Sequence, residues 1–444
     1  MEWMKANSLK PISPNFARFE IAYLSGDFTE PIRDPLWKDI GLTPAFKQLY
    51  RCEAMQKLGR IKQLGPTFHL YPGAVHTRLN HSLGVFHITR LMLLSFLHAW
   101  VDEPGSCPFT HQGIQSLLSA ALLHDLGHFP YAHALKELSL REHEQLAADI
   151  IEHDPTLLRI LTEEIGASVA SVLAIIDTHR ACPDAEVGFY RALLSGTLDP
   201  DKLDYLSRDA FFCGVPYGMQ DASFIISRMR YLPPGIPAIP LSAIGAVEHL
   251  LFSKYQMYQN VYWHQSTRSA TAMIKKALYL AITSGILHEK ELYDLDDEAF
   301  SHLALSHPEF KPFQLLDQVR ENQLFAVHAQ SRFNPTNPLH KAALTLNTRL
   351  ALEDELYNRI VVDFPQVQRH EIIIDVPENI SFEADIPIVQ PDGSSQPFCE
   401  VDELFNPSVV EAFTASLRKF RIFAPRWLDS PIFDQFLNGS RNTR

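Results

Sequence analysis

One apolar segment of this sequence ends in a histidine–aspartate pair of the kind that binds metal ions. Residues 117–125 read LLSAALLHD, and His128 follows His124 on the same face of a helix. A helix that is apolar on every side is buried, so polar groups at its end are costly unless something satisfies them. An imidazole beside a carboxylate suits Mn²⁺, Fe²⁺, Zn²⁺ or, more weakly, Mg²⁺. The helix end therefore predicts part of a metal site.

Two ligands are too few to hold such an ion, and the sequence offers others. His81 lies at the head of its own predicted helix, and an acidic residue of the segment DPDKLDY at 199–205 would add an oxygen ligand. A lone histidine is more often a core or capping residue than a ligand. An Arg-x-x-His, an His-Asp-x-x-His at the end of an apolar helix and a later aspartate, in that order, are much harder to explain by packing alone.

These motifs and their flanks resemble the HD phosphohydrolases. The segments RLNHSLGV at 78–85 and HDLGH at 124–128, followed by Asp201, match the H…HD…D signature of that family. The branch that hydrolyses deoxynucleoside triphosphates, which includes dGTPase-like and SAM-and-HD-domain enzymes, is matched further by RIKQLG at 60–65, YPGA at 71–74, HEQ at 143–145, DKLDY at 201–205 and, more weakly, YWH at 262–264. The likeness is specific over about residues 44–285 and fainter up to Ala424.

The resemblance implies a role for each matching residue. One divalent ion, with Mn, Mg, Fe, Zn and Ni all open, would be held by His81, His124, Asp125 and Asp201. The triphosphate would be contacted by Arg78, Lys202, Tyr205 and Lys254. The sugar would be bound at its 3′-hydroxyl by Gln63 and Asp209, and enclosed near C2′ by Leu64 and Tyr262. The α-phosphate would be surrounded by three histidines that orient water and protonate the leaving 5′-oxygen: His128, His133 and His143.

Phosphoester chemistry supports this division of roles independently. Hydrolysis at phosphorus needs a metal to withdraw charge, cations to stabilise the equatorial oxygens, and a group that titrates near neutral pH to protonate the leaving alkoxide. The chain departs from the family at two positions. Lys136 stands where the family has the acidic residue of a proton relay, for which Glu137 is the alternative here. Lys254 replaces an arginine that contacts the triphosphate. Related enzymes bind an activating guanine nucleotide through basic residues, which Lys57 and Gly59 match only in part. Whether a nucleotide activates this protein therefore stays open.

The resemblance thus predicts a metal-dependent enzyme that hydrolyses a deoxynucleoside triphosphate, with dGTP as one candidate, to a deoxynucleoside and inorganic triphosphate. Two alternatives stay open. The first is an HD hydrolase of another nucleotide, such as a monophosphate or a cyclic phosphodiester. The second is a non-catalytic nucleotide sensor. The sugar-pocket matches favour the deoxynucleoside triphosphate triphosphohydrolase over a hydrolase of another nucleotide, and the presence of all four metal ligands disfavours a sensor.

Composition limits the partners and the compartment. The 444 residues carry a net charge of −13, which argues against a broad nucleic-acid-binding surface but allows a locally positive pocket. No run approaches the roughly 20 apolar residues of a membrane-spanning helix, and the N-terminus lacks the apolar core of a secretory signal. Five scattered cysteines suit a reducing compartment. We expect a cytoplasmic protein without a membrane partner.

The periodicity predicts a mainly α fold, with an HD-domain helical core and a smaller α+β C-terminal segment that contains short strands. We expect an irregular N-terminal segment at 1–43, a helical HD domain at 44–335 and an α+β domain at 336–444. Helical patterns cover 43–64, 78–100, 115–128, 141–180, 187–212, 242–284 and 312–328. Short strands are predicted at 360–362, 371–375 and 386–389, with a turn at Asp392-Gly393.

The predicted helix 242–284 is unusually rich in large apolar residues. It carries Leu250, Leu251, Phe252, Tyr255, Met257, Tyr258, Val261 and Trp263, which is more than one face of a surface helix normally needs. Together with the assembly of related enzymes, this predicts a homo-oligomer, with a tetramer favoured. The alternative is that the helix is central to the core of the monomer.

Overall fold

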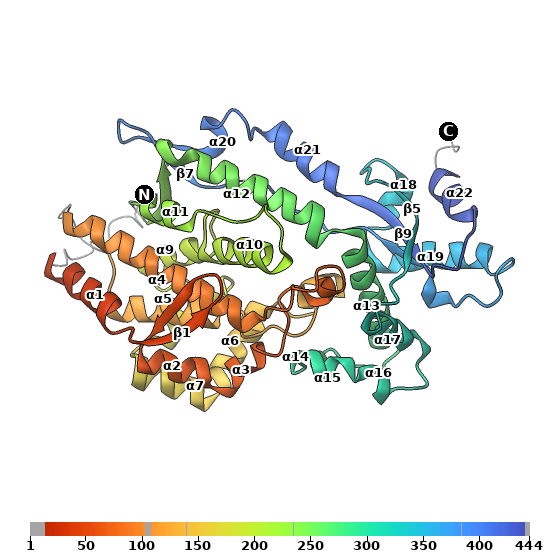
Figure 1. The fold of residues 1–444 in the computed structure, drawn as a ribbon, viewed down its shortest axis with the longest axis horizontal. Coiled ribbons are helices and arrows are strands. Elements are labelled where there is room, and N and C mark those ends of the chain that lie inside the picture. Colours follow the sequence, from red (N-terminus) through yellow and green to blue (C-terminus); the bar gives the residue numbers. More distant parts are fainter. Residues whose placement is uncertain (1–13, 103–107, 139, 234, 383, 440–444) are drawn as a thin grey trace.

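A computed structural model describes residues 14–102, 108–138, 140–233, 235–382 and 384–439 of the chain. Helices dominate the architecture, and a smaller α+β part carries short strands, so the predicted fold class is confirmed (Figure 1). The C-terminal part, blue in Figure 1, runs beside α12 (Ile244–Met257) and reaches the sheet around β5 (Ala326–Arg332) and β9 (Lys419–Ala424).

The N-terminal segment is more regular than predicted. Residues 1–13 lie outside the described part, but the next thirty form α1 (Pro14–Gly26) and a hairpin of β1 (Glu30–Asp34) and β2 (Lys38–Leu42). An irregular segment was expected because prolines are closely spaced in this part of the sequence, but Pro14, Pro31 and Pro44 occupy positions that tolerate them. Pro14 and Pro44 open helices, where the missing N–H costs nothing, and Pro31 lies in a two-stranded hairpin.

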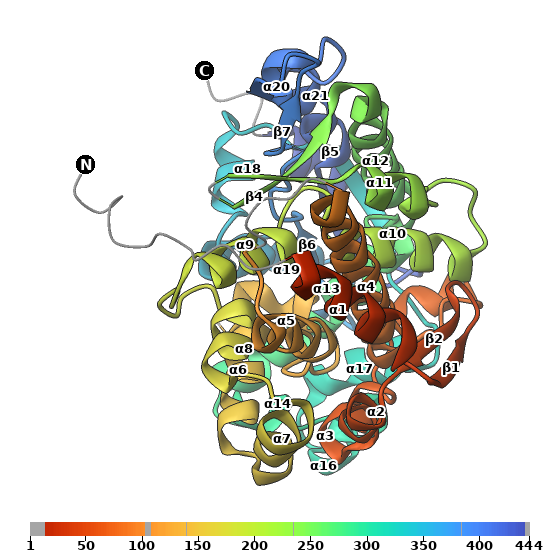
Figure 2. The same cartoon turned by 90° about the vertical axis from the view of Figure 1, so that its left-hand side faces the viewer.

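Long helix α4 (Arg78–Asp102) is the centre of the helical core. It packs against α1, α5 (His111–Leu123) and α10 (Pro200–Cys213), and Figure 2 shows α1 and α4 side by side. Every residue of α5 from Gly113 to Leu123 is buried, as its apolar sequence predicted. Among the described helices α4 alone has the length and composition to span a membrane; half of its most apolar window is buried within the fold, as in the core helix of a globular domain.

Shorter helices complete the first half of the chain, which forms most of the wall of the cavity described below. They are α2 (Pro44–Arg51), α3 (Glu53–Leu58), the 3-10 helix η2 (Gly65–His69), the 3-10 helix η3 (Ala132–Leu138), α6 (His143–His153), α7 (Pro155–Arg159), the π-helix η4 (Ile160–Ile165), α8 (Val169–Ile176) and α9 (Ala185–Leu194). The second half contains α11 (Ala222–Arg228), α13 (Gln265–Thr283), α14 (Lys290–Tyr293), α15 (Asp297–Ser301), α16 (Leu303–Ser306), α17 (Gln314–Arg320), α18 (Pro338–Ala342), α19 (Leu346–Ile360), α20 (Phe398–Val401), α21 (Pro407–Leu417) and α22 (Ile432–Gly439).

Two sheets join strands from both sides of the boundary predicted at residue 335. One has the order β3-β4-β7-β8, with β3 (Arg230–Leu232), β4 (Ile236–Pro240), β7 (Pro387–Val389) and β8 (Ser395–Pro397); β4 and β7 run parallel. The other has the antiparallel order β5-β9-β6, with β6 at Ile373–Asp375. Ile386 and Ile388 also pack in the hydrophobic core that is formed by α4 and α5. The C-terminal segment therefore shares sheets and core with the helical body, and the domain boundary at residue 335 stays a prediction.

The strand predictions succeed at two places and fail at one. Strands β6 and β7 fall within the predicted ranges 371–375 and 386–389, and Asp392-Gly393 lies in the turn before β8. The strand predicted at 360–362 is wrong, because α19 continues to Ile360. Leu356 and Ile360, one helical turn apart, are both fully buried and hold this end of α19 in the core. The helix predicted at 312–328 likewise ends early and gives way to β5.

The apolar residues that suggested oligomerisation are mostly used within the monomer. The predicted helix is divided into α12, the π-helix η6 (Tyr258–Tyr262) and α13. Its apolar side chains are buried at Leu250, Leu251, Met257, Val261 and Trp263 and partly buried at Tyr255 and Tyr258, and only Phe252 of the set is exposed, at 48%. A central core helix explains this pattern, so the expected oligomer rests on the resemblance alone.

Candidate metal and nucleotide site

A single cavity of about 960 Å³ gathers most of the residues that the sequence singled out. Its walls come from the η2 loop, the start of α4, the end of α5, the start of α6, the start of α10, α13 and residues 378–380. The predicted site residues that line it are Gln63, Leu64, Arg78, His81, His124, Asp125, His133, His143, Asp201, Lys202, Tyr205, Asp209 and Tyr262. His128 lies buried behind the wall, and Lys254 does not reach it.

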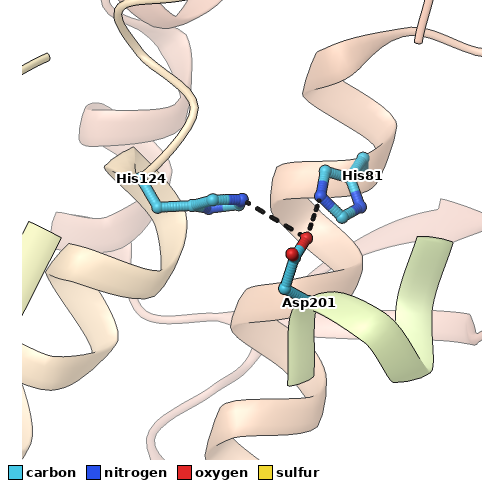
Figure 3. Close-up of side chains that lie close together, drawn as sticks. All are labelled: His81, His124 and Asp201. Carbon is cyan, nitrogen blue, oxygen red and sulfur yellow. Dashed lines mark ion pairs between the residues drawn. The ribbon is translucent and has the colours of Figure 1, made fainter. Parts of the chain in front are cut away.

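Three of the four predicted metal ligands point at one another (Figure 3). The ligand atoms of His81, His124 and Asp201 all lie within 4.8 Å of one another. His81 Nε2 is 2.9 Å from Asp201 Oδ1, and His124 Nε2 is 3.9 Å from the same oxygen. Each of the three residues lies at the end of a helix. His81 is in the first turn of α4, His124 directly follows α5, and Asp201 is in the first turn of α10, so three helices converge on one point.

The other nitrogen of each imidazole is held by an acceptor. His124 Nδ1 donates to the Ala121 carbonyl at 2.9 Å, and His81 Nδ1 lies 2.8 Å from Asp204 Oδ2. An oxygen that can only accept fixes the hydrogen on Nδ1, which leaves the Nε2 lone pair free for a metal. His124 Nε2 is buried and has no hydrogen-bond partner among the described residues. This orphaned atom and the mixed nitrogen and oxygen donors fit a divalent ion.

Asp125 lies beside this trio and links it to the other charged groups. Its Oδ1 is 3.4 Å from His124 Nε2, and its Oδ2 accepts a hydrogen bond of 2.9 Å from Arg78. Burial raises the pKa of Asp125, but His128, His124 and Arg78 outweigh it and hold that pKa well below the usual value. Asp125 is therefore an anionic carboxylate that can face an ion on one side and an arginine on the other.

Three further histidines cluster next to Asp125. The rings of His128 and His143 stack with centroids 4.0 Å apart, and the ring of His133 lies 4.8 Å and 5.4 Å from them. Burial lowers the pKa of each well below 6.5, and neighbouring cationic groups lower it further. The cluster is therefore neutral until an anion enters the cavity, when added negative charge favours the imidazolium form.

A second polar cluster lies in the same cavity, around Asp209. Tyr262 donates its hydroxyl to Asp209 Oδ2 at 2.7 Å, and His76 Nε2 lies 2.7 Å from Asp209 Oδ1. The backbone N–H of Gln63 donates to the His76 carbonyl at 2.9 Å. Gln63 Oε1 is buried without a hydrogen-bond partner in the described structure. Sequence reasoning missed His76, whose only signal was its position two residues before Arg78.

The two predicted phosphate-binding lysines differ in position, because Lys202 lines the cavity and Lys254 does not. Lys202 Nζ forms an ion pair with Asp199 and donates to the Gly196 carbonyl at 2.8 Å, so a phosphate would have to compete for it. Lys254 Nζ donates to the Ser381 carbonyl at 2.7 Å and lies over the Phe382 ring, off the cavity wall. A backbone carbonyl and an aromatic face, both distant in sequence, hold Lys254 there.

The alternative proton-relay residue is also engaged. Glu137 accepts hydrogen bonds from Lys275 and, in a bidentate pair, from Arg349. Burial raises the pKa of Glu137, but Arg349 and Lys275 outweigh it and lower that pKa. Lys136 does line the cavity, so the position expected to be acidic carries a positive charge at the wall.

Comparison with known proteins agrees with this geometry. Residues 78–207 match the HD domain, and residues 221–426 match the HD associated region. The uncharacterized protein YwfO of Bacillus subtilis is 34% identical over 290 residues, which is 64% of this chain and 61% of that protein. The deoxynucleoside triphosphate triphosphohydrolase SAMHD1 of Homo sapiens is 22% identical over 409 residues, which is 78% of this chain and 64% of that protein. The chain thus spans less than two thirds of the length of either relative.

Two solved structures share the fold. A phosphohydrolase from Bacteroides thetaiotaomicron superposes with a TM-score of 0.69 at 22% identity, covering 89% of this chain and 99% of the other. A hypothetical protein from Aquifex aeolicus superposes with a TM-score of 0.68 at 24% identity, covering 93% and 99%. The two solved structures show a shared fold alone. The matches of residues 78–207 to the HD domain and of residues 221–426 to the HD associated region identify the chain as an HD-domain protein.

Proposed function

We propose that the protein is a metal-dependent deoxynucleoside triphosphate triphosphohydrolase, which releases a deoxynucleoside and inorganic triphosphate. The observation that carries the proposal is that the metal trio and the Gln63–Asp209–Tyr262 cluster line one cavity, so a phosphate and a sugar can be bound together. Relatives from Homo sapiens, Danio rerio and Dictyostelium discoideum whose names state this activity or homology to it, at 22–27% identity, support the choice of substrate.

One divalent ion would be held by His81, His124, Asp125 and Asp201, and it would withdraw charge from the phosphate and acidify a water. Arg78 anchors on Asp125 through one nitrogen, while its Nε is buried without a described partner and is available to a phosphate oxygen. The water oxygen bonds to the α-phosphorus, the bond from phosphorus to O5′ breaks, and O5′ takes a proton.

The three clustered histidines have different roles in the proposed reaction. His133 and His143 line the cavity and are the candidates to orient the water and to protonate O5′. His128 is fully buried and stacks on His143, so it positions that ring and does not touch the substrate. The negative charge of the bound triphosphate raises the imidazole pKa values that burial depresses, so substrate binding itself prepares the proton donor.

The Asp209 cluster supports a preference for deoxyribose. The unpartnered Gln63 Oε1 can accept a hydrogen bond from a 3′-hydroxyl, and Leu64 and Tyr262 enclose the neighbouring edge of the sugar. A 2′-hydroxyl placed against Leu64 and the Tyr262 ring would lose its hydrogen bonds to water. Burying it unpaired costs about 1–3 kcal/mol, which corresponds to roughly a ten- to hundredfold rate difference.

The test is a product analysis over a panel of nucleotides with Mn²⁺ or Mg²⁺. We expect inorganic triphosphate and deoxynucleoside from at least one of the four deoxynucleoside triphosphates, and neither product from Asp125→Ala protein. Release of orthophosphate from a monophosphate, or cleavage of a cyclic phosphodiester, would instead support the other class of HD hydrolase. Tight binding without any product would support a nucleotide sensor.

A further inference from the structure

A fully buried carboxylate lies directly behind the metal ligand His81. Asp204, on α10, has an exposed fraction of 0% and receives four donors. Its Oδ2 lies 2.8 Å from His81 Nδ1 and accepts from Arg208 Nε at 2.8 Å, and its Oδ1 accepts from Arg208 at 2.9 Å and from the Trp37 indole N–H. A carboxylate has about four lone-pair positions, so Asp204 is saturated and cannot turn away from His81.

The hairpin of β1 and β2, which precedes the matched HD domain in sequence, supplies the Trp37 contact and holds the arginine that makes two of the others. Asp34 Oδ1 accepts from the backbone N–H groups of Leu36 and Trp37 at 2.9 and 2.8 Å, which fixes the turn between the two strands. Asp34 Oδ2 accepts from Arg208 at 2.7 Å. One carboxylate therefore shapes the turn that presents the Trp37 indole and also holds the arginine that chelates Asp204.

Helix α4 is shaped to admit this group. Gly84 lies one turn after His81, and a Cβ at Gly84 would be 1.8 Å from Asp204 Oδ1 and 2.6 Å from Arg208. A glycine inside a helix costs stability, so its presence at the closest approach to the carboxylate is explained by the space that Asp204 and Arg208 need.

We infer that the β1–β2 hairpin is a positioning element for the metal site, in which Trp37 and Asp34 lock Asp204 and Arg208 so that Asp204 holds the His81 ring with Nε2 aimed at the ion. Partners one step behind a metal ligand typically change metal affinity by about 10–100-fold when they are removed. The inference rests on the proposed metal site but not on the identity of the substrate.

The test measures metal affinity on full-length protein prepared without metal. Trp37→Phe removes the indole N–H and keeps an aromatic ring. Asp34→Asn keeps an acceptor for the turn and removes the charge that pairs with Arg208. Trp100→Phe is the matched control, because Trp100 packs against the same hydrophobic core as Trp37 and lies at the far end of α4 from His81. Titration calorimetry gives the Kd for Mn²⁺, and the visible spectrum of the Co²⁺-loaded protein reports ligand geometry.

We expect Trp37→Phe to raise the Kd about tenfold and to alter the Co²⁺ spectrum, with Asp34→Asn changing both in the same direction. Trp100→Phe should leave both unchanged even if it lowers the Tm of the metal-free protein. A role in folding alone would move the Tm and not the Kd of the folded fraction. Kd values and spectra equal to wild type in both hairpin variants overturn the inference. Failure of the wild-type protein to bind any ion overturns the metal site itself, and the inference with it.

Discussion

Replacing Gly84 with alanine should destabilise the protein, although a glycine-to-alanine change inside a helix usually stabilises it by about 1 kcal/mol. The alanine Cβ would stand 1.8 Å from Asp204 Oδ1, where contacts below 3.0 Å are essentially never seen. The carboxylate would have to withdraw by at least 1.2 Å, the difference between these two distances. Because Asp204 is pinned by donors from His81, Arg208 and Trp37, that movement breaks a buried ion pair.

Breaking a buried ion pair costs about 3–5 kcal/mol, which exceeds the helix-propensity gain of about 1 kcal/mol. We therefore expect Gly84→Ala to lower the free energy of unfolding by about 2–4 kcal/mol, measured by chemical denaturation of the metal-free protein. Gly188→Ala is the matched control, since Gly188 lies in α9 and its Cβ would meet only the Cys182 sulfur at 3.7 Å. If Gly84→Ala is as stable as Gly188→Ala, the saturated carboxylate does not constrain α4 and the reasoning fails.

Four further outcomes are expected. Asp125→Ala and His124→Ala should each lose metal binding and activity, because an under-coordinated ion loses both water activation and charge neutralisation. Circular dichroism should show that each variant keeps its fold. Near-normal turnover by a metal-loaded variant would exclude the assigned ligands. Hydrolysis of dGTP should be roughly ten- to a hundredfold faster than hydrolysis of GTP, and equal initial rates would rule out the sugar pocket. Burial and the nearby Lys276 lower the pKa of His370 to about 4, below its unfolded value, so its contribution to stability is complete above about pH 6.5 and is lost as the pH falls toward 4. In His370→Gln the free energy of unfolding, measured by denaturant titration, should therefore fall less steeply as the pH is lowered over that range. The same pH dependence as in the wild-type protein would refute the role given to His370. Light scattering at micromolar concentration should give a mass above that of one 50.4 kDa chain, close to that of a tetramer, and a stable monomer would contradict the oligomer.

The chemistry-bearing residues were predictable because each belongs to a local pattern. His124 follows an apolar helix, and His81 and Asp201 belong to short motifs near the starts of their own helices; the structure brings all three together. What periodicity could not supply was pairing between distant segments. The parallel contact of β4 with β7 joins residues separated by the whole of α12 and α13, and no local signal marks it.

The same limit applies to the groups around the ligands. Arg208 reaches Asp34 across 174 residues of sequence, and Trp37 reaches Asp204 across 167, so neither partner could be matched from spacing. The role predicted for Lys254 came from the resemblance, but a carbonyl 127 residues away decides where its ammonium lies. Closely spaced prolines concealed the hairpin, because their compatibility with helix starts and a two-stranded ribbon depends on exact position.

Phosphorus NMR of one reaction would show directly which phosphorus the protein attacks. Metal-loaded wild-type protein is incubated with dGTP, and the products are followed over time. We expect signals of inorganic triphosphate that grow in step with deoxyguanosine, with no nucleotide monophosphate or diphosphate at any point. Growth of orthophosphate with dGDP, or of pyrophosphate with dGMP, would place the cleavage at the wrong phosphorus and contradict it.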